Sequence, residues 1–207
     1  RIQKQIASFN AMSAVIADAG IPVKHEHLAC SAALISHPKS IKKFVRVGIM
    51  QYGFWPSKEI QMAYCTANNI IQNPLQPVIS WKSRIMSIKL VNQGDFVGYG
   101  NLVMAEKAMK IAIVPVGYSD GYSRSLSNQG KVLINGLRWD VIGTVNMNMI
   151  AVDITNIEKA EIGDEVVLIG NQGEFSITVA SFSDLSTQLN YELLTRLPKD
   201  IPRKIIA

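Results

Sequence analysis

The segment Val114–Ser125 (VPVGYSDGYSRS) places groups capable of acid–base chemistry directly after an apolar run. Tyr118 follows Gly117, and Asp120 stands two residues further on. A phenol has an unperturbed pKa of about 10, so it acts as a base near neutral pH only beside cationic or hydrogen-bond-donating neighbours. The alternative is a packed turn that Asp120 caps. The residues of this segment alone favour the packed turn.

A second group of candidate residues follows two predicted strands in the first third of the chain. Ser31 stands where a helix begins, and its hydroxyl with the free N–H groups there can hold a phosphate or simply cap the helix. Arg46 needs a partner if it lines a cleft, and His27 is a candidate, although a lone strand arginine is more often a surface residue. Gly48 allows close approach to the backbone. Because βα barrels place their sites at the carboxyl ends of the strands, Ser31 and Gly48 together favour a binding site.

Two histidines could form a metal pair, but the sequence offers no third ligand. His25 and His27 point to the same face of a strand, which is the geometry of a His-x-His pair. Glu26 faces the other way, and His37 belongs to a different element. We therefore interpret the pair as one exposed and one hydrogen-bonded histidine, and we expect no metal site.

Composition excludes several classes of protein. The chain has 207 residues, is 48% hydrophobic and has no apolar run of membrane-spanning length, which predicts a soluble globular protein without a membrane partner. Its polar start does not resemble a secretory signal. The net charge of +5 comes from scattered lysines, so no nucleic-acid partner is expected. Cys30 and Cys65 are too few for a disulfide framework.

The first 70 residues predict alternating helices and strands. Apolar residues at helical spacing over 2–16 end at Gly20, which is suited to a helix stop. A strand over 21–29, a helical turn over 31–35 and a strand over 44–53 form a parallel βαβ unit. Two such strands cannot cover both faces of a sheet, so further strands are expected upstream of the chain.

Residues 71–207 predict a mainly antiparallel β-domain, a barrel or a sandwich, followed by a helical section over about 179–197 that ends at Pro198. The predicted hairpins join 80–91 with 96–100, 131–134 with 137–143 around Asn135-Gly136, and 165–170 with 174–179. The change of period near residues 60–75 separates two domains, 1–70 and 71–207.

Taken in order, seven segments resemble the C-terminal half of alanine racemases, pyridoxal-phosphate enzymes that interconvert L- and D-alanine. They are HLACSAA, VRVGIMQYGFWPS, VGYGN, VPVGYSDGYSR, VLINGLRWDVIGTVNMNM, GDEVVLIG and NYELLTRLPKDIPR. The resemblance implies that 1–70 are the last βα units of a (β/α)8 TIM-type barrel holding pyridoxal 5'-phosphate, and that 71–207 are the family's C-terminal β-domain. It also implies a cytoplasmic head-to-tail homodimer acting on a small amino acid.

The same resemblance assigns roles in catalysis and substrate binding. Tyr118 matches the family's catalytic tyrosine, the base for L-alanine, which is contributed across the dimer. Met147 matches the residue whose backbone N–H meets the substrate carboxylate. Tyr122, the second tyrosine of the segment, is expected to serve in packing.

For the cofactor, Arg46 matches the arginine that hydrogen-bonds the pyridine nitrogen. An always-charged guanidinium keeps that nitrogen unprotonated. His27 matches the histidine that supports the arginine. The phosphate is expected to be held by Ser31, the backbone at Gly48 and Ile49, and the hydroxyl of Tyr191.

The sequence also departs from the family pattern. Asn148 replaces an aspartate next to Met147, and Cys30 replaces an asparagine. The segment carrying the family's cofactor-binding lysine has no match, and nothing recommends Lys24 in its place. We therefore expect a portion of a racemase that supplies D-alanine for peptidoglycan. The alternatives are a racemase of broader specificity that accepts serine, or a non-catalytic binding module. A lysine on a first β-strand upstream would exclude the binding module, and rates with alanine and serine would separate the two racemases.

Overall fold

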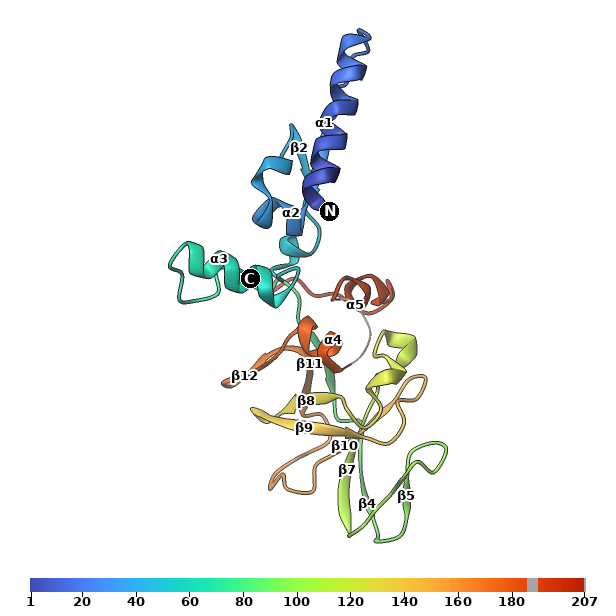
Figure 1. Cartoon of the computed structure of the whole chain (residues 1–207). Coiled ribbons are helices and arrows are strands. Elements are labelled where there is room, and N and C mark those ends of the chain that lie inside the picture. Colours follow the sequence, from blue (N-terminus) through green and yellow to red (C-terminus); the bar gives the residue numbers. More distant parts are fainter. Residues whose placement is uncertain (186–189, 207) are drawn as a thin grey trace. The chain divides into compact units, whose positions relative to one another are not determined.

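The computed structural model describes residues 1–185 and 190–206. It contains two compact units, Arg1–Val78 (unit 1) and Ile79–Ala207 (unit 2) (Figure 1). Among the described residues, no helix is both long enough and apolar enough to cross a membrane.

Unit 1 contains the parallel βαβ unit that the sequence predicts. Strand β1 (His27–Cys30) runs parallel to β2 (Phe44–Arg46), and α2 (Ser31–Ser36) connects them. The predicted first helix is confirmed as α1 (Ile2–Asp18), and Gly20 follows it with a φ of 70°. The remaining elements are the 3-10 helices η1 (Pro38–Ser40) and η2 (Ile49–Tyr52) and the helix α3 (Lys58–Ala67).

Both strands of unit 1 are shorter than predicted. Residues 21–26 are not strand, because β2 has only three residues and so offers β1 a short ladder. The predicted strand over 44–53 stops at Arg46, since the N–H of Gly48 donates to the Ser31 hydroxyl at 2.9 Å instead of joining a ladder, and η2 begins directly afterwards.

Unit 1 leaves much of its apolar surface uncovered. Ile6 is the buried residue of α1, whereas Met12 on the same helix is 63% exposed. The β2 residues Phe44 and Val45 are also exposed. Apolar surface of this kind usually belongs to an interface.

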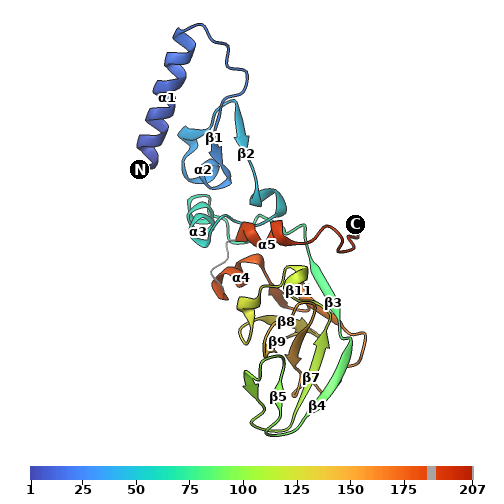
Figure 2. The same cartoon turned by 90° about the vertical axis from the view of Figure 1, so that its right-hand side faces the viewer.

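Unit 2 is built on an antiparallel sheet that closes on itself. Its strands lie in the order β12-β11-β8-β9-β10-β7-β4, and β3 pairs with β11. The strands are β3 (Trp81–Arg84), β4 (Ser87–Val91), β7 (Met109–Val114), β8 (Lys131–Ile134), β9 (Leu137–Ile142), β10 (Ile150–Asp153), β11 (Glu165–Gln172) and β12 (Phe175–Ile177). Strands β3 and β4 are consecutive in the chain, and they pair with β11 and β7, respectively. One continuous segment therefore joins β11 to β7 and closes the sheet. Figures 1 and 2 both show β4 beside β7.

Two of the three predicted hairpins are confirmed. Strands β8 and β9 meet around Asn135 and Gly136, whose φ angles of 52° and 75° suit a two-residue turn. Strands β11 and β12 form the second hairpin.

The predicted hairpin between 80–91 and 96–100 is wrong. The N–H of Ile85 donates to Asp164 and that of Met86 to Ile113, so this stretch changes partners in its middle. Strand β5 (Phe96–Val97) pairs instead with β6 (Val103–Met104).

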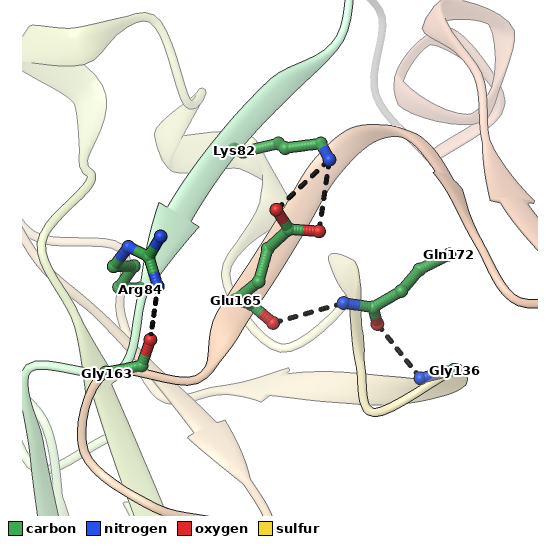
Figure 3. A network of polar contacts seen from close by, with 6 residues as sticks. All are labelled: Lys82, Arg84, Gly136, Gly163, Glu165 and Gln172. Atoms are coloured by element: carbon green, nitrogen blue, oxygen red, sulfur yellow. Dashed lines mark hydrogen bonds and ion pairs between the residues drawn. The ribbon is translucent and has the colours of Figure 1, made fainter.

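A network of polar contacts links β3 to β11, where the sheet closes, and β11 to the β8–β9 turn (Figure 3). Lys82 forms an ion pair with Glu165 at 3.1 Å, and Arg84 donates to the carbonyl of Gly163 at 2.7 Å. The Gln172 side chain accepts from the N–H of Gly136 at 3.0 Å and donates to the carbonyl of Glu165 at 3.3 Å. One side chain therefore links the β8–β9 turn to β11.

The predicted helical section corresponds to α4 (Val179–Leu185) and α5 (Asn190–Arg196). Residues 186–189 of that prediction lie outside the described residues.

Candidate active site

The predicted site residues fall into a group in unit 1 and a group in unit 2. Unit 1 carries His27, Ser31, Arg46, Gly48 and Ile49; unit 2 carries Tyr118, Met147 and Tyr191.

In unit 2, the segment after β7 folds into a capped turn. The chain leaves β7 at Val114 and enters a 3-10 helix, η3 (Tyr118–Asp120). The Asp120 carboxylate accepts from the N–H of Gly117 at 2.9 Å. The predicted capping role of Asp120 is thereby confirmed. The Tyr118 side chain at the start of the turn is 44% exposed.

This turn is bonded to the segment that carries Met147. The N–H of Tyr118 donates to the carbonyl of Asn146 at 3.0 Å. Ser119 donates twice to the carbonyl of Met147, from its N–H at 2.9 Å and from its hydroxyl at 2.7 Å. The structure therefore brings Tyr118 and Met147 together through their backbones, and both side chains stay exposed.

The contact between the two segments requires a glycine at position 117. A Cβ there would lie 2.3 Å from the carbonyl oxygen of Asn146 and 2.4 Å from that of Met147. Both neighbours are backbone atoms, so no side chain can move aside. Gly117 is thus the residue that lets Tyr118 and Met147 approach.

The side chains of Ser127 and Asn128, in a third segment, accept hydrogen bonds from the loop that carries Met147. The N–H of Val145 donates to the Ser127 hydroxyl at 3.0 Å, and that of Gly143 to the Asn128 side chain at 2.6 Å. Asn148, the departure from the family pattern, is exposed. The loop is consequently held through its backbone N–H groups, and within residues 1–185 and 190–206 the Asn148 side chain forms none of these bonds.

The second tyrosine of the segment is a packing residue, as predicted. Tyr122 is fully buried, and its ring contacts Trp81 at 6.1 Å and Phe182 at 5.6 Å between centroids. Its hydroxyl is buried without a hydrogen-bond partner among the described residues. Burial raises the pKa of Tyr122 above its usual range, which excludes it as a base near neutral pH.

In unit 1, Ser31 and Gly48 meet at the carboxyl ends of the two strands. Ser31 is buried as the first residue of α2, and its oxygen accepts the N–H of Gly48. A hydroxyl that accepts one bond keeps its own hydrogen to donate. No atom lies within 4 Å of a Cβ built on Gly48, and the next residue, Ile49, is buried. This arrangement suits an anionic group.

Arg46 lies beside this pair, but its bond differs from the expected one. Its guanidinium donates to the carbonyl of Leu28 at 3.2 Å rather than to His27, the predicted partner. The strand register explains the difference, since it places Cys30 opposite Arg46, and His27 opposite Phe44. The Arg46 and His27 side chains are both exposed.

The remaining expectations concern Tyr191 and the histidines. Tyr191 lies on α5 and is 42% exposed. His25 packs its ring against Phe44, with centroids 5.1 Å apart. Within the part of the chain that the structure describes, no three His, Cys, Asp or Glu residues gather in a way that could hold a metal ion.

Sequence reasoning missed Ser119 and the reason for Gly117. Ser119 bonds to a residue 28 positions away, and no local pattern marks such a contact. Gly117 could be noticed as a glycine at the exit of a strand, a position that often marks close approach of another backbone.

Comparison with known families and proteins gives a consistent result. The family described as "Alanine racemase, C-terminal domain" matches residues 78–205, and "Alanine racemase, N-terminal domain" matches residues 1–56. An alanine racemase from Carboxydothermus hydrogenoformans is 40% identical over 96% of this chain and 52% of its own length. One from Leptospira interrogans is 39% identical over 87% of this chain and 46% of its own length. The chain thus spans about half the length of the curated relatives it matches.

Solved structures are similar as well. The alanine racemase of the D-cycloserine producer Streptomyces lavendulae matches all of this chain and 52% of its own, with a TM-score of 0.89 and 29% identity. The Bacillus anthracis alanine racemase with bound L-Ala-P matches 95% of this chain and 48% of its own, with a TM-score of 0.84 and 30% identity.

Proposed function

The chain belongs to the alanine racemase family, and we propose that in the full-length enzyme it provides part of the site that interconverts L- and D-alanine. The observation that carries this proposal is the bonded pair of loops in unit 2. It joins the backbone of Tyr118, whose phenol is exposed, to the segment that carries Met147, and the family pattern assigns these two residues to proton transfer and to substrate binding.

The architecture follows from the same proposal. Residues 1–70 form the last βα units of a (β/α)8 barrel, and residues 71–207 form the C-terminal β-domain. The parallel pair β1–β2 and the exposed apolar residues of α1 and β2 support a barrel that continues beyond these elements. Two such chains form a head-to-tail homodimer in the cytoplasm, in which each Tyr118 serves the site of the partner. The D-alanine produced supplies peptidoglycan.

The residues of unit 1 fit the phosphate of pyridoxal 5'-phosphate. Ser31 keeps a hydroxyl hydrogen to donate, and Gly48 leaves open space beside it. The backbone at Gly48 and Ile49 would add phosphate contacts, and the family pattern assigns the hydroxyl of Tyr191 to the same group. With the cofactor bound, Arg46, which donates to the Leu28 carbonyl in this structure, would donate to the ring nitrogen and keep it unprotonated, and His27 would support Arg46. When bound, the cofactor supplies the carbanion stabilisation that loss of an α-proton requires.

The proton transfers belong to the protein. The Tyr118 oxygen takes the α-proton of L-alanine, while the N–H of Met147 holds the substrate carboxylate. A planar carbanion has two faces, so a second base is needed for D-alanine. In the family this is the lysine that carries the cofactor, and we assign it to the segment without a match in this chain.

Proton exchange in the full-length protein tests the proposal. Wild-type enzyme in D2O is expected to place deuterium at Cα of alanine and to racemise it, and Tyr118→Phe should slow loss of the L-alanine proton by about 100-fold or more with cofactor absorbance unchanged. Tyr122→Phe is the matched control, because this buried tyrosine of the same segment has no role in proton transfer. Normal exchange in Tyr118→Phe would remove Tyr118 from the mechanism. Faster exchange with serine than with alanine would change the substrate, and no exchange with either would leave a binding module.

A further inference from the structure

We infer that Ser119 is a positioning residue. Its bonds hold the backbone of the catalytic tyrosine and the carboxylate-binding amide of Met147 in a fixed arrangement. The inference rests on the proposed function of Tyr118 and Met147. It concerns a residue to which neither the motifs nor the chemistry of the turn assigned a role.

The first step is the direction of the peptide groups around Met147. The chain has no cis peptide bonds among its described residues, so each C=O points opposite to the N–H of the same peptide unit. The Asn146 carbonyl accepts from Tyr118, and the N–H of Met147 belongs to that same peptide unit. The Met147 N–H therefore points away from the Tyr118 backbone, and the bond from Tyr118 sets its direction.

The second step is that Ser119 fixes the next peptide unit. Both its N–H and its hydroxyl donate to the Met147 carbonyl, at 2.9 Å and 2.7 Å. The peptide planes on both sides of the Met147 Cα are then anchored to residues 118 and 119. With both planes fixed, the φ and ψ angles of Met147 are fixed as well, and its N–H cannot swing.

The bond from Tyr118 also affects how strongly the Met147 N–H can donate a hydrogen bond. A carbonyl that accepts a hydrogen bond polarises its peptide unit, which makes the N–H on the other side a better donor. The Tyr118 backbone thus strengthens the amide proposed to hold the substrate, and the Ser119 hydroxyl preserves the geometry in which it does so. Losing the hydroxyl leaves the Met147 carbonyl with the Ser119 N–H as its anchor from this turn.

The expected effect is moderate, because Ser119 touches neither substrate nor cofactor. Loss of one such bond corresponds to about a 3- to 10-fold fall in kcat/KM. L- and D-alanine are mirror images of equal free energy, so kcat/KM must fall equally in both directions. The primary deuterium isotope effects measured with L-alanine and with D-alanine distinguish a positioning role of Ser119 from a general loss of activity.

The experiment uses the full-length protein with Ser119→Ala. Because Tyr118 takes the proton of L-alanine, its step should become more rate-limiting, so the primary deuterium isotope effect on kcat/KM should rise with L-[2-2H]alanine and fall with D-[2-2H]alanine. Ser119→Thr keeps a hydroxyl and should restore both values. Ser125→Ala is the matched control, since this exposed serine of the same segment pairs with Ser123.

A second measurement needs neither cofactor nor substrate. Amide hydrogen exchange of the Tyr118 N–H should accelerate by about 3- to 10-fold in Ser119→Ala and stay unchanged in Ser125→Ala. If Ser119→Ala leaves both the isotope effects and this exchange rate at wild-type values, the positioning role is refuted. A wild-type enzyme that exchanges no α-proton refutes the proposed function instead. In that case the exchange rate of the Tyr118 amide still tests whether the Ser119 hydroxyl holds the loop of Met147.

Discussion

Replacing Gly117 by alanine tests whether the contact between the two loops is as close as the structure shows. The new Cβ would lie 2.3 Å from the carbonyl oxygen of Asn146, whereas ordinary contacts begin at 3.4 Å. The difference between these two distances is 1.1 Å, and the backbone must supply it. Gly117 has a φ of −154°, which alanine also adopts, so the predicted damage comes from the collision alone.

The cost can be worked from the bonds that such a shift breaks. Three hydrogen bonds join the loops, one from Tyr118 and two from Ser119, at 2.7 to 3.0 Å. Each contributes about 0.5–1.5 kcal/mol, and overpacking adds about 1–3 kcal/mol. We expect Gly117→Ala to lower the free energy of unfolding of unit 2 by roughly 5 kcal/mol, which is a fall in Tm of about 10–20 °C for a chain of this size.

Thermal unfolding of the whole chain, followed by tryptophan fluorescence, measures this loss, because Trp81 packs against Tyr122 in the core of unit 2. Ser119→Ala is the graded comparison, since it removes one of the three bonds without a collision and should cost about 1 kcal/mol. A Tm for Gly117→Ala within about 2 °C of wild type would refute the close contact and with it the coupling of Tyr118 to Met147.

Two further substitutions test the core and the closure of the sheet. Tyr122→Phe should stabilise unit 2 by about 1 kcal/mol, because it removes a buried hydroxyl without a partner. Burial raises the pKa of Tyr122 in the folded state. The free energy of unfolding of the wild type is therefore not reduced by this group below about pH 10, and it falls above that pH by roughly 1 kcal/mol per pH unit. The advantage of Tyr122→Phe in Tm should therefore widen at alkaline pH, and parallel pH profiles would contradict the burial argument. Gln172→Ala should cost about 1–2 kcal/mol in urea unfolding, because it leaves the N–H of Gly136 without its acceptor (Figure 3). Lys82→Ala, which removes a half-exposed ion pair nearby, should cost about 0.5 kcal/mol or less, and equal losses for the two variants would contradict this ranking.

Local sequence signals predicted the parts of the fold that local geometry determines. The turn at Asn135-Gly136 requires positive φ angles that few residues adopt, and the structure has them at both positions. The segment 81–91 lacks such a determinant. It leaves β11 and joins β7 at Ile85 and Met86, and both partners are far away in the sequence. A turn-based reading therefore paired this segment with its neighbour in the chain.

For the candidate site, the order of motifs predicted that Tyr118 and Met147 belong to one site, but it contained no information on how their segments are joined. The joining depends on a backbone approach at Gly117 and on a hydroxyl of Ser119, each acting across about thirty residues of chain. In unit 1 the pattern identified Arg46, yet its bond to Leu28 follows from a strand register that alternation alone does not set.

The two tyrosines of the segment Val114–Ser125 differ in burial, because Tyr122 is fully buried and Tyr118 is exposed. Tyr122 donates its N–H to the carbonyl of Gly117, and its ring is fully buried between Trp81 and Phe182. The buried ring fixes the end of the turn, while Tyr118 at its start projects from the surface. Burial raises the pKa of the Tyr122 phenol and makes it an inert anchor, while the Tyr118 phenol of the same turn stays exposed. The backbone of the proposed base is therefore held at two places, by the Tyr122 ring at the end of the turn and by the bonds from Ser119 to the Met147 carbonyl.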